Sequence, residues 1–306
     1  MFMLKKIIIQ IIEYCFCIKT ILQKQYYNFL MIYYPKKWSD ILYKEKFGKN
    51  INWKNPTDIN EKINWLAFNS DTTLWSKYAD KYNVRNYIKE VGLEHILVPL
   101  YGKWDTAHDI NFNQLPSKFV LKNNHGCGDC ILVRDKTSIN KQQIINKIDK
   151  TLHHRYGIET AEPHYLKIKP CIIAEKLLES ENSEGLIDYK IYCFNCQPFN
   201  ILVSSDRDIE KHKVNFTLYS TKWEYISDNY FIDKYKNGIK IQRPKHLDKM
   251  LEYARILSKP FKHVRVDLYE VDGKVYFSEL TFTSTGGRMY FFTPEYLKIM
   301  GNQIII

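Results

Sequence analysis

A β-hairpin near the C-terminal end constrains the fold of this chain more than any other segment. Residues 263–281 (HVRVDLYEVDGKVYFSELT) have the pattern of a strand, a tight turn and a second strand. Because side chains alternate along a strand, Arg265 and Asp267 share one face of the first strand. Glu279 and Thr281 share one face of the second strand. Acidic groups aimed at one place from two neighbouring strands can hold a hard cation such as Mg²⁺, so the hairpin predicts a metal site.

The predicted site depends on the register of the hairpin. A two-residue turn would place Asp267 and Glu279 on opposite faces, because a shift of one residue reverses the face. A three-residue loop at residues 271–273, with Gly273 left-handed in a bulge, pairs Arg265 with Glu279 and gathers the polar side chains on one face. We therefore predict the three-residue loop. A surface hairpin with one polar face is the alternative.

Composition bounds the class of protein. The chain has 306 residues, of which 45% are hydrophobic and 26% charged, enough for a sizeable core. The net charge of +11 favours anionic partners: nucleotides, acidic polysaccharide, nucleic acid or an anionic membrane surface. Because the basic residues are scattered, without a long basic run, we expect no nucleic-acid partner.

The cysteines bear on the cellular compartment. Seven cysteines, an odd number, in a chain without a convincing signal peptide predict a reduced, cytoplasmic location. Cys127 and Cys130 form one pair with metal-like spacing, and Cys193 and Cys196 form another. A zinc site is the alternative use of these pairs.

The N-terminal segment is apolar but interrupted by charge. Residues 1–34 are rich in Ile, Leu, Tyr and Phe, yet lysines break every run that could span a membrane. We expect an amphipathic helix that packs on the body or makes peripheral contact with the inner face of the membrane.

The remaining pattern predicts an α+β fold with largely antiparallel sheets. Hydrophobic periodicity and capping residues predict helices at residues 1–35, 57–68, 73–91, 138–156 and 247–259. Strands are predicted at residues 118–122, 131–133, 171–176, 188–194 and 199–203.

A glycine-containing loop joins two of these strands. Residues 123–129 (NNHGCGD) connect a strand to a strand, so the loop is not a Walker loop, which opens a helix. Its backbone N–H groups can still lie over phosphates, with Lys122 supplying positive charge. An ordinary long hairpin is the alternative. Lys190 lies on a strand face where it would reach phosphate oxygens, and a solvated face is the alternative there.

Together these segments resemble the TupA-like proteins of the ATP-grasp superfamily, which occur in bacterial surface-polysaccharide clusters. The resemblance covers residues from about 55 to 302. Its marks, in order, are Asn55–Trp65 (NPTDINEKINW), Ala79–Arg85 (ADKYNVR), Leu115-Pro116 before Phe119–Gly126 (FVLKNNHG), Ile173–Glu175 (IAE), Asp188–Lys190 (DYK) and Phe277–Phe282 (FSELTF).

The resemblance implies an ATP-grasp fold, with two α+β subdomains that clamp ATP behind a helical N-terminal region. The subdomains would comprise residues 71–170 and 171–306, after the helical residues 1–70. It implies that Lys81, Lys122 and the loop with His125, Gly126 and Gly128 contact the nucleotide, and that Glu175, Lys176 and Leu178 form the adenine and ribose hinge. It further implies that Asp267, Glu279 and Thr281 hold Mg²⁺, while Lys190, Arg265 and Arg288 act on the transferring groups.

Two positions depart from the family pattern. Superfamily members usually carry asparagine two residues after the second acid, where this chain has Thr281. The glycine loop also carries Cys127 and Cys130 where small residues are usual.

The hypothesis that follows is an ATP-dependent carboxylate–amine ligase in surface-polysaccharide assembly. A carboxylate would attack the γ-phosphorus of ATP, and an amine would attack the acyl phosphate. The expected partners are ATP, an acidic glycan or lipid-linked sugar, and an amino acid or amino sugar. A degenerate ATP-binding protein, a glycosyltransferase and a phosphoryl transferase remain alternatives.

Overall fold

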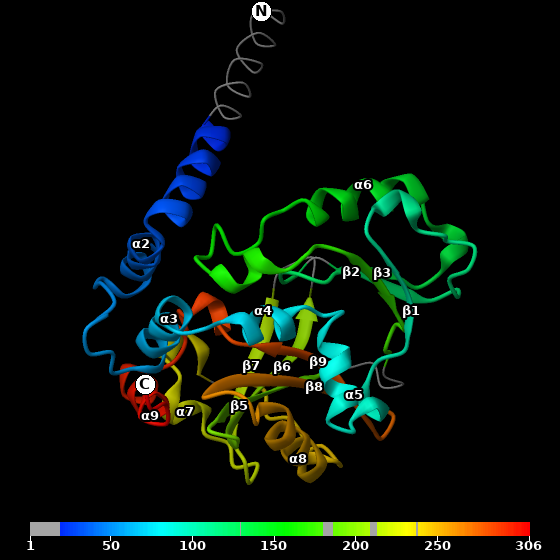
Figure 1. The fold of residues 1–306 in the computed structure, drawn as a ribbon. Helices are drawn as coiled ribbons and strands as arrows, with labels where there is room; N and C mark the ends of the chain where they lie inside the picture. Colours follow the sequence, from blue (N-terminus) through cyan, green and yellow to red (C-terminus); the bar gives the residue numbers. More distant parts are fainter. Residues whose placement is uncertain (1–18, 129, 180–185, 209–212, 237) are drawn as a thin grey trace, which may run out of the picture.

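Two antiparallel β-sheets organise the chain in the computed structural model (Figure 1). The structure describes residues 19–128, 130–179, 186–208, 213–236 and 238–306. The smaller sheet has the strand order β1-β4-β2-β3 and the larger sheet the order β7-β6-β5-β8-β9. The predicted α+β class with antiparallel sheets is confirmed. The strands are β1 (Leu100–Trp104), β2 (Phe119–Asn123), β3 (Cys130–Val133), β4 (Ile172–Glu175), β5 (Asp188–Phe194), β6 (Gln197–Asp208), β7 (Lys213–Ser220), β8 (His263–Val271) and β9 (Lys274–Thr281).

Helices cover the outer faces of both sheets. The α-helices are α2 (Pro35–Phe47), α3 (Ile59–Asn69), α4 (Thr73–Ala79), α5 (Val84–Glu90), α6 (Lys141–Leu152), α7 (Ser227–Tyr230), α8 (Leu247–Ser258) and α9 (Pro294–Gly301). The 3₁₀ helices are η1 (Glu94–Ile96), η2 (Ala107–Asp109), η3 (Lys136–Ser138), η4 (Pro163–Lys167), η5 (Asp233–Tyr235) and η6 (Ser284–Gly286). Figure 1 shows α6 over the smaller sheet and α8 on the far side of the larger sheet.

The core of the larger sheet explains which side chains of β8 face the space between the sheets. Val264, Val266 and Leu268 are fully buried in the main hydrophobic core, to which α8 also contributes. Because side chains alternate along the strand, Arg265 and Asp267 point to the opposite face. The smaller sheet is held separately by α6, whose Ile144 and Ile148 belong to one apolar cluster with residues of β2 and β4.

The β8–β9 hairpin has the predicted polar face, but its turn differs from the predicted one. Its turn has two residues, Asp272 and Gly273, with φ of 50° and 70°, and Val271 pairs with Lys274. Positive φ at both central residues is what the common two-residue hairpin turn requires. The prediction of a three-residue loop with a bulge at Gly273 is therefore wrong.

The bulge lies instead at Ser278. The register shifts between the pairs Leu268–Phe277 and Asp267–Glu279, so Glu279 stands directly opposite Asp267. Without the extra residue, Glu279 would point into the apolar core, where an unpaired carboxylate is costly. The predicted common face for the four polar side chains of the hairpin is thus correct, although the pairing that produces it is not.

The predicted helix at residues 73–91 is interrupted. The carboxylate of Asp80 accepts hydrogen bonds from Tyr82 N (2.8 Å) and Asn83 N (3.1 Å). These bonds stabilise a turn that ends α4, and the separate helix α5 begins after it. Lys81 therefore lies in a turn between two helices rather than on a helix face. The sequence reading also missed strands β1 and β7.

Asp58 caps α3 by accepting a hydrogen bond from Glu61 N. Strand β4 belongs to the smaller sheet, although the predicted division at residues 170 and 171 assigns it to the second subdomain. That division remains a prediction.

Of the predicted N-terminal helix, residues 1–18 lie outside the described part of the chain, and residues 19–33 are helical. Figure 1 shows this helix extending away from the two sheets. Among the described residues, the structure contains no helix with the length and apolarity needed to cross a bilayer.

Candidate functional site

A cavity of about 560 Å³ lies between the two sheets. Lys122 of β2 lines it from the smaller sheet, and Lys190, Arg265 and Glu279 line it from the larger sheet. Lys81 reaches it from the turn between α4 and α5. The cavity therefore brings together cationic side chains that are far apart in the sequence, with Glu279 among them.

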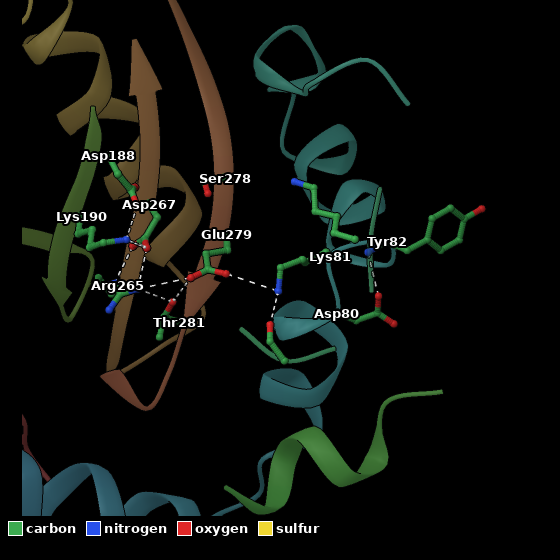
Figure 2. Close-up of polar contacts among 12 residues, drawn as sticks. Asp80, Lys81, Tyr82, Asp188, Lys190, Arg265, Asp267, Ser278, Glu279 and Thr281 are labelled. Carbon is green, nitrogen blue, oxygen red and sulfur yellow. Dashed lines mark hydrogen bonds and ion pairs between the residues drawn. The ribbon is translucent and has the colours of Figure 1, made fainter. Parts of the chain in front are cut away.

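Glu279 is the carboxylate at the centre of this cluster (Figure 2). Its Oε2 lies 3.6 Å from Lys81 Nζ, and its Oε1 lies 3.4 Å from Arg265 Nη2. Burial alone would raise the pKa of Glu279, but the charges of Lys81, Arg265 and Lys190 lower it to about 2. Glu279 is therefore ionised at neutral pH.

Asp267 lies beneath the cluster rather than on the cavity wall. Its carboxylate is completely buried and accepts hydrogen bonds from Arg265 Nε (2.7 Å), Arg265 Nη2 (2.6 Å) and Lys190 Nζ (2.8 Å). Lys190 also forms an ion pair with Asp188. Burial would lower the pKa of Lys190, but these two aspartates raise it. Both cations are thereby held in place and charged.

Thr281 occupies the position where an asparagine was expected. Its hydroxyl donates a hydrogen bond to Glu279 Oε1 (3.2 Å) and accepts one from Arg265 Nη2 (3.0 Å). The Thr281 side chain thus orients the carboxylate of Glu279 in the cavity wall.

The oxygen-bearing side chains of the site could take part in binding Mg²⁺ in only one arrangement. Within the described ranges, no group of three or more His, Cys, Asp or Glu side chains could hold a metal ion. Mg²⁺ commonly uses one or two carboxylates, with nucleotide phosphates and waters completing its shell. Glu279 is ionised and partly exposed, as that arrangement requires, whereas both oxygens of Asp267 are already bonded to cations. The residues present therefore fit an ion carried by nucleotide phosphates, with Glu279 as the nearest protein ligand.

The described residues of the glycine loop line the cavity and are hydrogen-bonded to Lys81. Lys81 Nζ donates a hydrogen bond to Gly126 O (2.6 Å), and Lys81 N donates one to Asn124 O (2.9 Å). Gly126 and Gly128 have φ of 93° and 84°, which other residues rarely adopt. His125 is buried, with its Nε2 lying 3.1 Å from the backbone oxygen of His154.

The two pairs of cysteines belong to different sheets, because Cys127 follows β2 and Cys193 lies in β5.

The predicted hinge residues lie beside the cavity. Glu175, at the end of β4, accepts contacts from Lys122 Nζ (2.6 Å) and Arg85 Nη1 (3.0 Å). Burial would lower the pKa of Lys122, but Glu175 raises it. Lys176 is exposed, and Leu178 packs against an apolar cluster with Val98. None of the three hinge residues lines the cavity wall in this structure.

Arg288 lines the cavity together with a residue that the sequence reading missed. Both Nη atoms of Arg288 donate to Thr160 O at 3.1 Å. Two residues further on, buried Glu162 accepts a hydrogen bond from Thr283 Oγ1. No local pattern marks Glu162 as part of a site, because the Thr283 hydroxyl that bonds its side chain lies 121 positions away in the sequence.

The comparisons with known proteins bear on the family. The sequence of residues 61–305, most of the chain, matches the TupA-like ATP-grasp family. The chain belongs to this family. The match covers the segments that carry the resemblance from Glu61 onward. A comparison with curated proteins gives no match.

Solved structures with related folds are distant. D-alanine–D-alanine ligase from Bacillus anthracis, complexed with ATP, is 16% identical with a TM-score of 0.40, over 67% of this chain and 55% of that one. The Helicobacter pylori D-alanine–D-alanine ligase is 14% identical with a TM-score of 0.41, over 82% of this chain and 70% of that one. N5-carboxyaminoimidazole synthetase from Staphylococcus aureus, complexed with ADP, is 15% identical with a TM-score of 0.38, over 66% and 43%. The chain thus spans little more than half of the first of these proteins.

Proposed function

We propose that this protein is an ATP-dependent carboxylate–amine ligase that forms an acyl phosphate and releases ADP. The observation that carries the proposal is the convergence of Lys81, Lys122, Lys190 and Arg265 on one cavity with the ionised Glu279. A triphosphate with its metal ion needs several cations and one carboxylate within such a space. Membership in the ATP-grasp family supports the same ligand.

The side chains have separate tasks in this proposal. Lys122 and Lys190 come from opposite sheets, so phosphates between them would be neutralised from both sides. Lys81 would hold the glycine loop over the phosphates through Gly126 O. Mg²⁺, when bound, would neutralise charge on the transferring phosphoryl group. Glu279, oriented by Thr281, would be its protein ligand, and Asp267 would position Lys190 and Arg265.

Base and ribose binding is proposed for the segment after β4. Glu175 holds Lys122 at 2.6 Å and so connects this segment to the phosphate side of the cavity. Lys176 and Leu178 follow directly, and Lys176 N donates a hydrogen bond to Pro99 O at the start of this segment. We expect these residues to contact the nucleoside.

The acid substrate is proposed to be a uronic acid of a surface glycan or a lipid-linked sugar. Lys46 of α2 and Arg288 both line the cavity, and Lys46 is exposed. With the net charge of +11, these residues favour a polyanionic substrate. The amine would come from an amino acid or amino sugar. Mass spectrometry of products from ATP, an amino-acid pool and a uronic-acid oligosaccharide tests this assignment, since amide formation leaves a mass smaller by one water than the two substrates together.

The second candidate is a degenerate family member that binds ATP without turnover. It is favoured by Thr281 in the asparagine position and by the saturation of Asp267 with Arg265 and Lys190. Isothermal titration with Mg-ATP, followed by an ADP-release screen over acids and amines, separates the two. Binding without ADP release under any pair of substrates favours the degenerate member.

Peripheral membrane contact is proposed for the helix at residues 19–33. Leu30 and Met31 are buried and fix its end near Trp38 of α2. Other apolar side chains of the helix and its end are exposed, namely Ile21, Leu22, Tyr26, Phe29, Ile32, Tyr33 and Tyr34. Basic residues such as Lys19 and Lys24 accompany them, as in helices that lie on anionic lipid surfaces. Sedimentation with phosphatidylglycerol vesicles tests this, and binding that persists unchanged in the Phe29→Glu/Ile32→Glu variant contradicts it.

A further inference from the structure

A buried carboxylate lines the cavity without a role in the proposed ATP site. Glu162 is 3% exposed and immediately precedes η4. Its Oε1 accepts a hydrogen bond from Thr283, whereas its Oε2 has no hydrogen-bond partner among the residues that the structure describes. A buried carboxylate oxygen without a partner is costly. An unpartnered oxygen beside a substrate cavity therefore indicates a missing ligand group.

The segment that carries Glu162 is rigidly attached to the cavity wall. Both Nη atoms of Arg288 donate hydrogen bonds to Thr160 O at 3.1 Å. Glu162 N donates to Gly157 O at 2.8 Å, and Ala161 has φ of 56°, a strained value for a residue with a side chain. Strain of this kind persists where surrounding contacts fix the backbone. The carboxylate is thus held in place before any ligand arrives.

The charges around Glu162 favour a cationic ligand or a proton. Burial raises the pKa of Glu162, while hydrogen bonding from the Thr160 and Thr283 side chains and the charge of Arg288 oppose that rise, and the charge of Glu279 adds to it. Burial and the negative charge of Glu162 raise the pKa of the Tyr165 phenol, which therefore stays neutral. An anionic substrate group would be repelled from Oε2, whereas an ammonium group would supply the missing hydrogen-bond donor and the balancing charge.

We propose that Glu162 binds the ammonium group of the amine substrate and removes one proton from it before attack. This inference rests on the proposed ligase function and deepens it. The substrate class it assigns to this part of the cavity is a primary amine.

The proposed step balances in protons and charge. The ammonium R–NH₃⁺ gives one proton to the Glu162 carboxylate and becomes R–NH₂. The amine lone pair forms the C–N bond at the acyl carbon, and the bond from that carbon to the phosphate oxygen breaks. The second amine proton leaves with the phosphate as HPO₄²⁻, and the Glu162 carboxyl returns its proton to water. No other co-reactant is needed.

Calorimetry with amine probes tests the assignment. D-glucosamine and L-alaninamide are titrated into the full chain with a non-hydrolysable ATP analogue and Mg²⁺, and their N-acetylated forms serve as neutral probes. We expect the wild-type protein to prefer the amines at least tenfold. In Glu162→Gln this preference disappears, and in Glu162→Asp part of it returns. Glu159→Gln is the matched control, because Glu159 lies in the same segment but is exposed.

The pH profile separates ligand binding from a structural role. Amine affinity of the wild-type protein falls as pH is lowered through the pKa of Glu162, whereas Glu162→Gln has no such dependence. The assignment is overturned if Glu162→Gln keeps the preference within twofold, or if the folded wild-type protein does not prefer amines. If the protein does not bind the nucleotide, that result contradicts the proposed function and not the role of Glu162. In that case, amine binding measured without nucleotide decides the role of Glu162.

Discussion

Lys190 in β5 stands directly opposite Asp267 in β8, and its Nζ lies 2.8 Å from the Asp267 oxygen Oδ2. Both side chains are buried, and Arg265 donates two further hydrogen bonds to the same carboxylate. The cations that face the cavity are thus supported from beneath by one buried acid. This relationship connects the stability of the larger sheet to the electrostatics of the site.

Replacement of Asp267 tests whether its carboxylate stabilises the buried cations Lys190 and Arg265. Asp267→Ala leaves Lys190 and Arg265 buried with less compensation, so we expect a loss of about 3–5 kcal/mol in the free energy of unfolding. Urea denaturation measures it. The control is Glu94→Gln, which removes an exposed pair with Lys89 and changes stability by less than about 1 kcal/mol. An equal, small effect of both substitutions would show that Asp267 has no such supporting role.

Replacement of Lys81 tests the glycine loop. Lys81→Met removes the hydrogen bond to Gly126 O and the cation beside Glu279. We expect at least about tenfold weaker binding of Mg-ATP, equivalent to 1.4 kcal/mol, in isothermal titration. Lys77→Met, at an exposed position one helical turn earlier, is expected to bind as the wild-type protein does. Equal affinities in the two variants would remove Lys81 from the nucleotide site.

Replacement of Asp272 tests the two-residue turn. The residue is exposed and has φ of 50°, a conformation that asparagine tolerates and alanine disfavours by roughly 1–2 kcal/mol. Asp272→Ala is therefore expected to lower the stability by that amount, and Asp272→Asn to leave it nearly unchanged. Urea denaturation compares the two. If both variants match the wild-type protein, the turn does not have the positive φ described.

The pH dependence of stability tests the charge on Glu279. Its pKa in the folded protein, about 2, lies below the ordinary glutamate value of 4.5. Ionised Glu279 therefore contributes stability above about pH 4.5, and this contribution is lost as the pH falls toward 2. Glu279→Gln is expected to be less stable than the wild-type protein at pH 6 and to lose less stability on acidification. Parallel curves for the two proteins from pH 6 to pH 2.5 would contradict the depressed pKa.

Much of the fold was predictable from local patterns. Alternation in β8 correctly placed Arg265 and Asp267 on one face of the strand, because side chains of a strand alternate between its two faces. The bulge at Ser278 was missed although the sequence carries a sign of it. Phe277 and Leu280 both lie in the core at a spacing of three, which a regular strand does not allow. The turn chemistry of Asp272 was read as part of a longer loop.

The site was predictable only where residues follow a local or family pattern. Lys122, Lys190 and Glu279 line the cavity, and their predicted roles toward a nucleotide and a metal ion stay predictions. Glu162 was missed because its hydrogen bond to Thr283 joins distant parts of the chain. Asp80 was missed as a helix breaker because the apolar periodicity continues on both sides of it.

The central claim, that the cavity around Glu279 turns over Mg-ATP, is tested most directly by the rate of ADP formation. The measurement uses a uronic-acid oligosaccharide and an amino-acid pool, with wild-type protein, Glu279→Gln and the exposed control Glu159→Gln. We predict ADP formation by the wild-type protein and the control, and a rate at least about 100-fold lower in Glu279→Gln because the transition-state charge loses its stabilisation. Equal rates in all three proteins would contradict the claim.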